Sequence, residues 1–149
     1  MSFKYAISGI LSAIKSERNL RFHMVIANLI AVFAYFYGLS RVEWAVLVLT
    51  AFAVISAELF NTALEAAVDT ATEEIKKSAK LAKDAAAGSV LVLAIAALLV
   101  GVCLFGNVSR ISDTLIHIFT TPKILVPCLV LGILDIIFLV FGGKNDKKI

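Results

Sequence analysis

The sequence has few charged residues for its length. Only 17% of its 149 residues are Asp, Glu, Lys or Arg, while 60% are hydrophobic and the mean hydropathy is +0.95. A soluble domain has about a quarter charged and about half apolar residues, so this chain cannot cover a water-facing surface of ordinary polarity. The composition excludes an ordinary soluble domain. It also excludes a disordered chain, which would be poor in apolar residues. The remaining class is an integral membrane protein.

Cysteine is scarce as well, and several nucleotide-binding motifs are missing. The two cysteines, Cys103 and Cys128, both lie in apolar runs, which excludes a disulfide scaffold. The sequence contains no P-loop, no glycine-rich phosphate loop and no kinase catalytic-loop motif. Any nucleotide site must therefore be of unusual construction. We expect no nucleic-acid partner.

Four apolar stretches have about the length that a membrane helix needs. The hydrocarbon core of a bilayer is roughly 30 Å thick and takes about 20 helical residues, or about 17 at the short end. The stretches are residues 24–39, 42–64, 85–105 and 124–141. Their continuous Ala- and Leu-rich runs favour helices over the strands of a barrel. The first stretch is not interpreted as a signal peptide, because it has no small-residue cleavage site before a polar mature region.

Two further segments have the pattern of amphipathic helices lying on the membrane surface. In the first, apolar residues recur at helical spacing as Phe3, Ile7, Ile10 and Ile14. In the second, they recur as Val108, Ile111, Leu115 and Ile118. We interpret the second segment as a structural connector. The predicted fold class is all-α integral membrane, with an N-terminal surface helix and four transmembrane helices.

The basic residues predict the orientation. Eleven of the 14 lie near the N-terminus, in residues 70–84 or in the C-terminal tail, and three lie on the opposite side. The positive-inside rule places the eleven in the cytoplasm. These residues can serve topology alone, or they can also bind an anionic substrate.

The second apolar stretch ends in a stripe of polar residues. Offsets of 0, 3, 4, 7 and 11 place on one helix face Glu58, Asn61, Thr62, Glu65 and Asp69. A charge within the hydrocarbon costs a few kcal/mol and usually pairs or marks a functional path. If the helix begins at residue 42, Glu58 lies about 24 Å along it and Glu65 about 10 Å further. The stripe therefore runs from the membrane into the cytoplasm.

Carboxylates and an amide beside a lysine-rich segment are suited to Mg²⁺. This ion takes oxygen ligands, usually one or two carboxylates together with substrate phosphates. The deeper carboxylate would then face a lipid alcohol, and the lysines would neutralise phosphate. Taken alone, Glu65 and Asp69 are better explained as an ordinary helix end, whose acids are either solvated or paired with Lys76, Lys77 and Lys80. Glu58 and Asn61 lie inside an apolar run, and for them the functional interpretation is the better one.

Two other acidic positions have alternative interpretations. Glu17 lies at the membrane level of Glu65, where it can supply a second metal carboxylate or form an ion pair with Arg18 or Arg21. Lys83 and Asp84, at the entrance to the third stretch, can neutralise phosphate, or Asp84 can cap that helix from its first turn.

At these residues the sequence resembles the prokaryotic diacylglycerol kinase and undecaprenol kinase family of small membrane lipid kinases. The resemblance covers about residues 3–105. The signature Glu-x-x-Asn-(Ser/Thr)-x-x-Glu-x-x-x-Asp is met by the polar stripe that begins at Glu58. Glu17 upstream reinforces the match, as does Ala82-Lys83-Asp84 followed by Ala-Ala-Gly downstream.

The resemblance implies a homotrimer with active sites at the membrane–cytoplasm boundary of the bacterial cytoplasmic membrane. ATP is the implied phosphoryl donor and Mg²⁺ the implied cofactor. The implied catalytic residues are Glu58, as general base towards the lipid hydroxyl, and Asn61, as a positioner of metal or substrate. Glu17 and Glu65 are the implied metal carboxylates. The residues implied for the ATP site are Tyr5, Glu17, Glu65, Glu74, Lys76, Lys83 and Asp84.

The acceptor lipid has two alternatives. Ser-Glu-Arg-Asn-Leu-Arg-Phe-His, which begins at Ser16, and the Val42-Glu43-Trp44 entry to the second stretch resemble the Gram-positive branch, whose acceptor is undecaprenol. Diacylglycerol is the alternative. A small transporter or channel subunit is an alternative of another class, but it would need its key acid near the bilayer centre. The acids here gather at one end, which favours chemistry on a lipid headgroup.

The chain departs from the family after residue 105. We therefore divide it into a lipid kinase core, residues 1–105, and an extension, residues 106–149. The extension holds the connector, a fourth transmembrane helix and a basic cytoplasmic tail. Asp135 in that helix is either paired in a helix interface or a functional intramembrane acid. Pairing is favoured, because the kinase signature is complete without Asp135.

Overall fold

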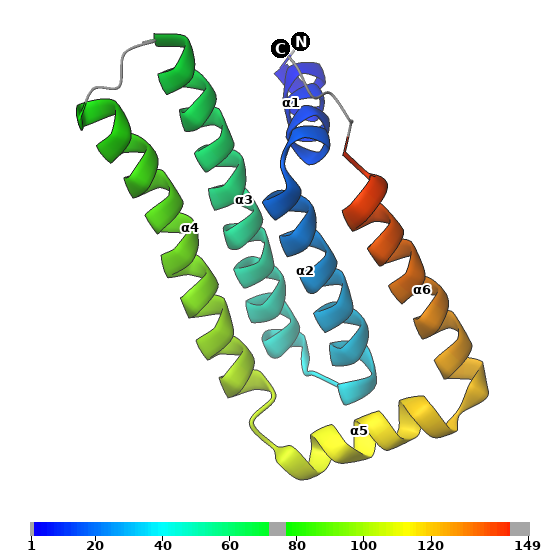
Figure 1. Ribbon diagram of the computed structural model, residues 1–149. Helices are drawn as coiled ribbons and strands as arrows, with labels where there is room; N and C mark the ends of the chain where they lie inside the picture. The colour runs from blue at the N-terminus through cyan, green and yellow to red at the C-terminus, as the bar shows by residue number, and fades with distance from the viewer. Residues whose placement is uncertain (1, 72–76, 144–149) are drawn as a thin grey trace.

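In the computed structural model, the chain is helical throughout nearly all of its described part, residues 2–71 and 77–143 (Figure 1). The helices are α1 (Ser2–Ser16), α2 (Arg18–Tyr37), α3 (Arg41–Ala71), α4 (Lys77–Leu104), α5 (Val108–Thr120) and α6 (Pro122–Phe141). Four of these, α2, α3, α4 and α6, are long and apolar enough to cross a membrane. The predicted all-α membrane class is confirmed.

Helices α3 and α4 form a long antiparallel hairpin (Figure 1). They contain 31 and 28 residues, and at 1.5 Å per residue they are about 46 and 42 Å long, well beyond the roughly 30 Å of hydrocarbon. Their extra length lies at the end where Lys83 Nζ contacts Asp69 Oδ1 at 2.6 Å. The hairpin therefore carries an ion pair beyond the apolar part of the bundle.

This geometry corrects two expectations. Because α4 begins at Lys77, Asp84 lies about two turns inside the helix, and the predicted first-turn capping role is wrong. Asp69 pairs with Lys83 and not with Lys77 or Lys80. The third lysine considered as its partner, residue 76, lies outside the described residues.

A packed core lies at the opposite end of the bundle. Helix α2 ends there at Gly38, whose φ of 75° is the left-handed conformation that glycine adopts without strain. The buried residues of this core are Ala34, Tyr37 and Leu39, and Phe33 and Phe105 are among the partly buried residues around them. From α5, the guanidinium of Arg110 lies over the Tyr37 ring and donates to the Gly38 carbonyl at 2.7 Å.

The extension covers one side of α2. Helix α5 crosses below the bundle, and α6 returns beside α2 (Figure 1). Asn28 Nδ2 of α2 donates to Asp135 Oδ2 of α6 at 2.8 Å, which confirms that Asp135 is paired in a helix interface. None of the residues of α6 is buried, and an exposed surface as apolar as this one is suited to lipid.

Candidate functional site

The first feature of the site is a buried carboxylate on α3. Glu58 is 5% exposed and lies about 26 Å along the helix from Arg41. Its Oε1 is 3.3 Å from Nε2 of His23, which belongs to the first part of α2. A carboxylate withdrawn from water needs such a polar partner. The packing of α2 on α3 therefore creates a histidine–carboxylate pair in the part of α3 that leads towards the Lys83–Asp69 ion pair.

One turn further along α3, an amide faces a second carboxylate. Asn61 Nδ2 donates to Glu65 Oε1 at 3.1 Å. The other polar atom of this amide, Oδ1, is buried and has no hydrogen-bond partner among the described residues. The Thr62 hydroxyl donates to the Glu58 backbone carbonyl and serves its own helix. Since buried polar atoms are nearly always paired, Asn61 Oδ1 is an acceptor left for a cation or a donor group.

Glu17 brings a third carboxylate to this region. It is the single residue between α1 and α2, and its backbone is extended, with φ −100° and ψ 113°. Helix α1, which Glu17 follows directly, packs on α2 and α3, the helices that carry His23 and Glu58. A further carboxylate near this junction adds negative charge, which a bound cation would offset. The alternative ion pair of Glu17 with Arg18 or Arg21 is not found in the described part of the chain.

The donor set fits a magnesium ion shared with a substrate. No three His, Cys, Asp or Glu side chains within residues 2–71 and 77–143 lie close enough to hold a metal ion by themselves. Mg²⁺ does not need such a cage, because it keeps several waters and combines one or two carboxylates with phosphate oxygens. The carboxylates of Glu17 and Glu65 and the Asn61 Oδ1, which has no partner among the described residues, are oxygen donors of the kind that this ion takes.

The structure does not gather all the predicted ATP-site residues. Tyr5 on α1 is 72% exposed, Lys83 pairs with Asp69, and Asp84 is exposed on α4. No hydrogen bond within the described ranges joins any of them to Glu58. Glu74 and Lys76 lie outside the described residues.

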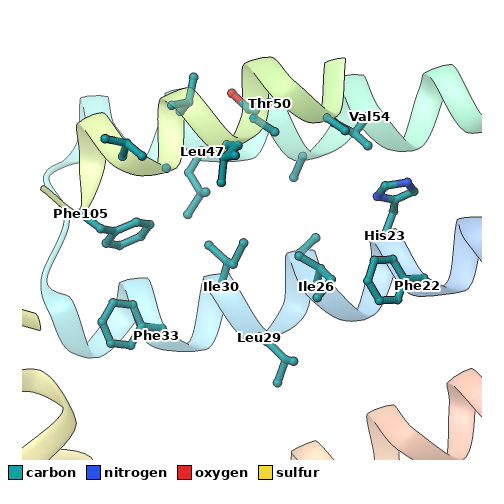
Figure 2. A pocket seen from close by; sticks show the side chains of 18 of the residues that line it. Phe22, His23, Ile26, Leu29, Ile30, Phe33, Leu47, Thr50, Val54 and Phe105 are labelled. Carbon is teal, nitrogen blue, oxygen red and sulfur yellow. The ribbon is translucent and has the colours of Figure 1, made fainter. Parts of the chain in front are cut away.

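An apolar groove of about 800 Å³ is lined by His23, the partner of Glu58, but not by Glu58 itself. Helices α2 and α4 each pack on α3, and residues of all three line the groove. Figure 2 shows His23 at one end and Phe105 at the other. The hydroxyl of Thr50 in its wall donates to the Val46 carbonyl at 2.8 Å. A hydrocarbon chain lying in the groove would bring its polar end to the buried carboxylate.

His23 is the part of the site that the sequence reasoning missed. In the sequence it stands out only as the last residue of the stretch that begins at Ser16. A helix through residues 18–37 places His23 on one face with Leu20 and Ala27. Leu20 is 1% exposed, and Ala27 lines the groove. This apolar face was the available signal that His23 points inward.

Comparison with known proteins identifies a family and three relatives that this chain resembles. The family described as prokaryotic diacylglycerol kinase matches residues 4–105. A diacylglycerol kinase of Synechocystis is 44% identical over 105 residues, which are 70% of this chain and 60% of that protein. An undecaprenol kinase of Bacillus subtilis is 38% identical over 104 residues, covering 70% of this chain and 85% of the relative. A diacylglycerol kinase of Haemophilus influenzae is 30% identical over 91 residues, or 61% of this chain and 77% of the relative.

The match to the Synechocystis protein thus spans less than two thirds of that relative. No solved structure matches the chain. The family match covers most of the chain and includes each element of the acidic site, from Glu17 to the α3 stripe. The chain belongs to the prokaryotic diacylglycerol kinase family, a family of multi-pass membrane lipid kinases that use ATP.

Proposed function

We propose that this protein transfers the γ-phosphoryl group of ATP to the hydroxyl of a membrane lipid alcohol. The site would face the cytoplasm from the bacterial cytoplasmic membrane. One observation carries the proposal: the apolar groove has its polar end at His23, and Nε2 of His23 lies 3.3 Å from the buried Glu58 carboxylate. An apolar chain and a reactive hydroxyl need such a boundary, and a polar nucleotide can reach it from the water.

In this proposal Glu58 is the general base. It takes the proton from the lipid hydroxyl as the oxygen attacks the γ-phosphorus, and ADP leaves on the opposite side. His23, at 3.3 Å, holds the carboxylate in its orientation. Burial keeps bulk water from replacing the base and from competing with the lipid as acceptor.

Glu17, Glu65 and Asn61 form the metal-binding part of the proposal. When bound, Mg²⁺ neutralises phosphate charge and supports the transfer. Asn61 Nδ2 holds the Glu65 carboxylate while its Oδ1 stays available. Lys83 would take part in phosphate binding. Its partner Asp69 is well exposed, and an exposed ion pair contributes little free energy, so Lys83 can leave Asp69 and bind a phosphate instead. Tyr5, Glu74, Lys76 and Asp84 stay proposals for the ATP site.

Undecaprenol is the proposed acceptor, and diacylglycerol is the alternative. The resemblance of the stretch that begins at Ser16, and of the Val42-Glu43-Trp44 entry to α3, to the Gram-positive branch supports this choice. Labelled phosphate transfer from ATP to both lipids, at equal mole fractions in the same nanodiscs, tests the choice. Preferential labelling of undecaprenol supports it, and preferential labelling of diacylglycerol overturns it.

A pair of matched variants tests whether the groove holds the lipid. Ala97 lines the groove, whereas its neighbour Ala96 is exposed on another face of α4. Ala97→Phe should raise KM for the lipid without changing KM for ATP, while Ala96→Phe should leave both values near wild type. Equal effects of the two substitutions would place the lipid elsewhere.

We also infer that residues 1–105 carry the chemistry, that residues 106–149 are an added unit, and that the protein assembles as a homotrimer. Membership of the family supports the trimer. Native mass spectrometry of the full chain released from nanodiscs tests it, since a monomeric or dimeric mass would contradict the assembly.

A further inference from the structure

Arg21 is a buried cation at the junction of three helices. It lies near the start of α2 and is 6% exposed. Its Nη1 donates to the carbonyl of Ile14 at 2.7 Å and to that of Lys15 at 3.1 Å. These carbonyls belong to the last turn of α1, which leaves its carbonyl groups without partners inside the helix. A positive charge is also favourable at a helix C-terminus. Arg21 therefore fastens the end of α1 to α2.

The extension covers this arginine from the other side. A Cβ atom built on Gly143, just after α6, would lie 2.8 Å from Arg21 Nη2 and 3.1 Å from Cζ. One built on Gly142 would lie 3.2 Å from Arg21 Cδ. The side chain of Arg21 thus lies against the backbone of two glycines, and a Cβ at Gly143 would fit only if the guanidinium moved away. The C-terminal end of α6 also adds its negative dipole end beside the cation.

A second contact fixes where α6 sits along α2. Asn28 and Asp135 are joined at 2.8 Å. Asn28 follows Arg21 by seven positions, and Asp135 precedes Gly142 by the same number. On antiparallel helices both intervals are about 10 Å long, so the Asn28–Asp135 bond sets the register that brings the glycines to Arg21. A polar pair within an apolar interface is well suited to specifying register.

We propose that the extension is a clamp that holds Arg21 on the end of α1, and that Arg21 is a positioning residue for the active site. Glu17 follows α1 directly, so fixing the last turn of α1 fixes the backbone that carries this carboxylate. The lipid groove is lined by α2, α3 and α4, with Phe105 and with Ile111 of α5, and no residue of α1 or α6 lines it. Release of the clamp should therefore weaken Mg-ATP binding and leave lipid binding intact. This kinetic expectation rests on the proposed function.

The kinetic experiment compares two glycines of the extension in the full chain. In Gly143→Ala the new methyl group must displace the guanidinium. In the matched control, Gly132→Ala, the new methyl group meets nothing within 4 Å. We expect KM for Mg-ATP to rise roughly tenfold in Gly143→Ala, as for the loss of one hydrogen bond to a charged group. KM for the lipid and all constants of Gly132→Ala should stay near wild type. Loss of kcat with unchanged KM for Mg-ATP would overturn the positioning role.

A second measurement is independent of kinase activity. A spin label at Ser12→Cys, exposed on α1, is placed in a Cys103→Ser, Cys128→Ser background. We expect Gly143→Ala to increase the mobility of the label in nanodiscs and Gly132→Ala to leave it unchanged. Unchanged mobility in Gly143→Ala would overturn the clamp even if the protein is a kinase.

Substitutions at Asp135 test the clamp through the Asn28–Asp135 contact. Their readout is the mobility of the label, so it is independent of the proposed kinase function. Asp135→Leu removes the contact and should mobilise the label, whereas Asp135→Asn can keep it and should not. Equal mobility in these two variants would contradict the register argument. If the wild-type protein transfers no phosphate, the proposed function fails, and the label still decides the clamp.

Discussion

Replacement of Glu58 by glutamine tests the proposed chemistry at its centre. Glutamine has nearly the same shape, and its carbonyl oxygen can still face His23 across the 3.3 Å contact. It cannot accept the proton of a lipid hydroxyl at neutral pH. The substitution therefore separates the role of the base from the packing of a residue that is only 5% exposed.

The expected fall in kcat can be worked out from the contribution of a general base alone. A positioned general base contributes about 10²- to 10⁴-fold to a rate, which is about 3 to 5 kcal/mol of transition-state stabilisation. Burial leaves little water to replace the base, so we expect Glu58→Gln to lower kcat about a thousandfold. His23→Gln removes only the group that orients the base, and it should cost about tenfold.

The assay is single-turnover transfer of labelled phosphate to undecaprenol in nanodiscs at saturating Mg-ATP. Glu43→Gln is the matched control, because it makes the same chemical change on the same helix. Glu43 accepts a hydrogen bond from the Ser40 backbone at the opposite end of α3, and its replacement should leave transfer near wild type. If Glu58→Gln keeps more than about a tenth of wild-type turnover, Glu58 is not the base.

Three further predictions concern the metal, the ion pair and the extension. Glu65→Gln should require about tenfold more Mg²⁺ for half-maximal activity, and an unchanged Mg²⁺ titration would remove Glu65 from the metal site. Asp69→Asn should change the free energy of unfolding in detergent by less than about 1 kcal/mol, because the Lys83 pair is exposed; a larger loss would mean that the pair is structural. Asp135→Leu should lower that free energy by about 1 kcal/mol through loss of the Asn28 bond, while Asp135→Asn should not, and equal losses would show that the bond contributes nothing.

The membrane class and the polar stripe could be predicted because each depends on a local pattern. Apolar runs of sufficient length identify a spanning helix whatever its neighbours are. The spacing of Glu58, Asn61 and Glu65 places them on one helix face before any packing is known. The observed Asn61–Glu65 hydrogen bond is a direct result of that spacing.

The contacts between helices could not be predicted in the same way. In a membrane, apolar helices associate through shape and a few polar contacts, so hydropathy does not indicate which faces meet. The Asn28–Asp135 bond joins residues 107 positions apart, and the His23–Glu58 pair depends on how α2 packs on α3. Neither contact can be predicted from the sequence without the structure.

The early start of α4 has a local signal in the sequence. The segment from Lys77 to Asp84 consists largely of alanine and lysine, which are strong helix formers. Hydropathy alone begins the span near residue 85, because the preceding lysines lower the average. Helix propensity would have extended the helix towards Lys77 and placed Lys83 within reach of Asp69.

The most direct test of the central claim is the fate of the γ-phosphate of ATP in sealed vesicles that contain the purified full chain. We predict that labelled phosphate appears in the organic-extractable lipid fraction, only with protein and Mg²⁺ present, and without any flux of protons or ions across the membrane. If the label stays in ATP or free phosphate while the protein carries an ion flux, the protein is a transporter or channel subunit and not a lipid kinase.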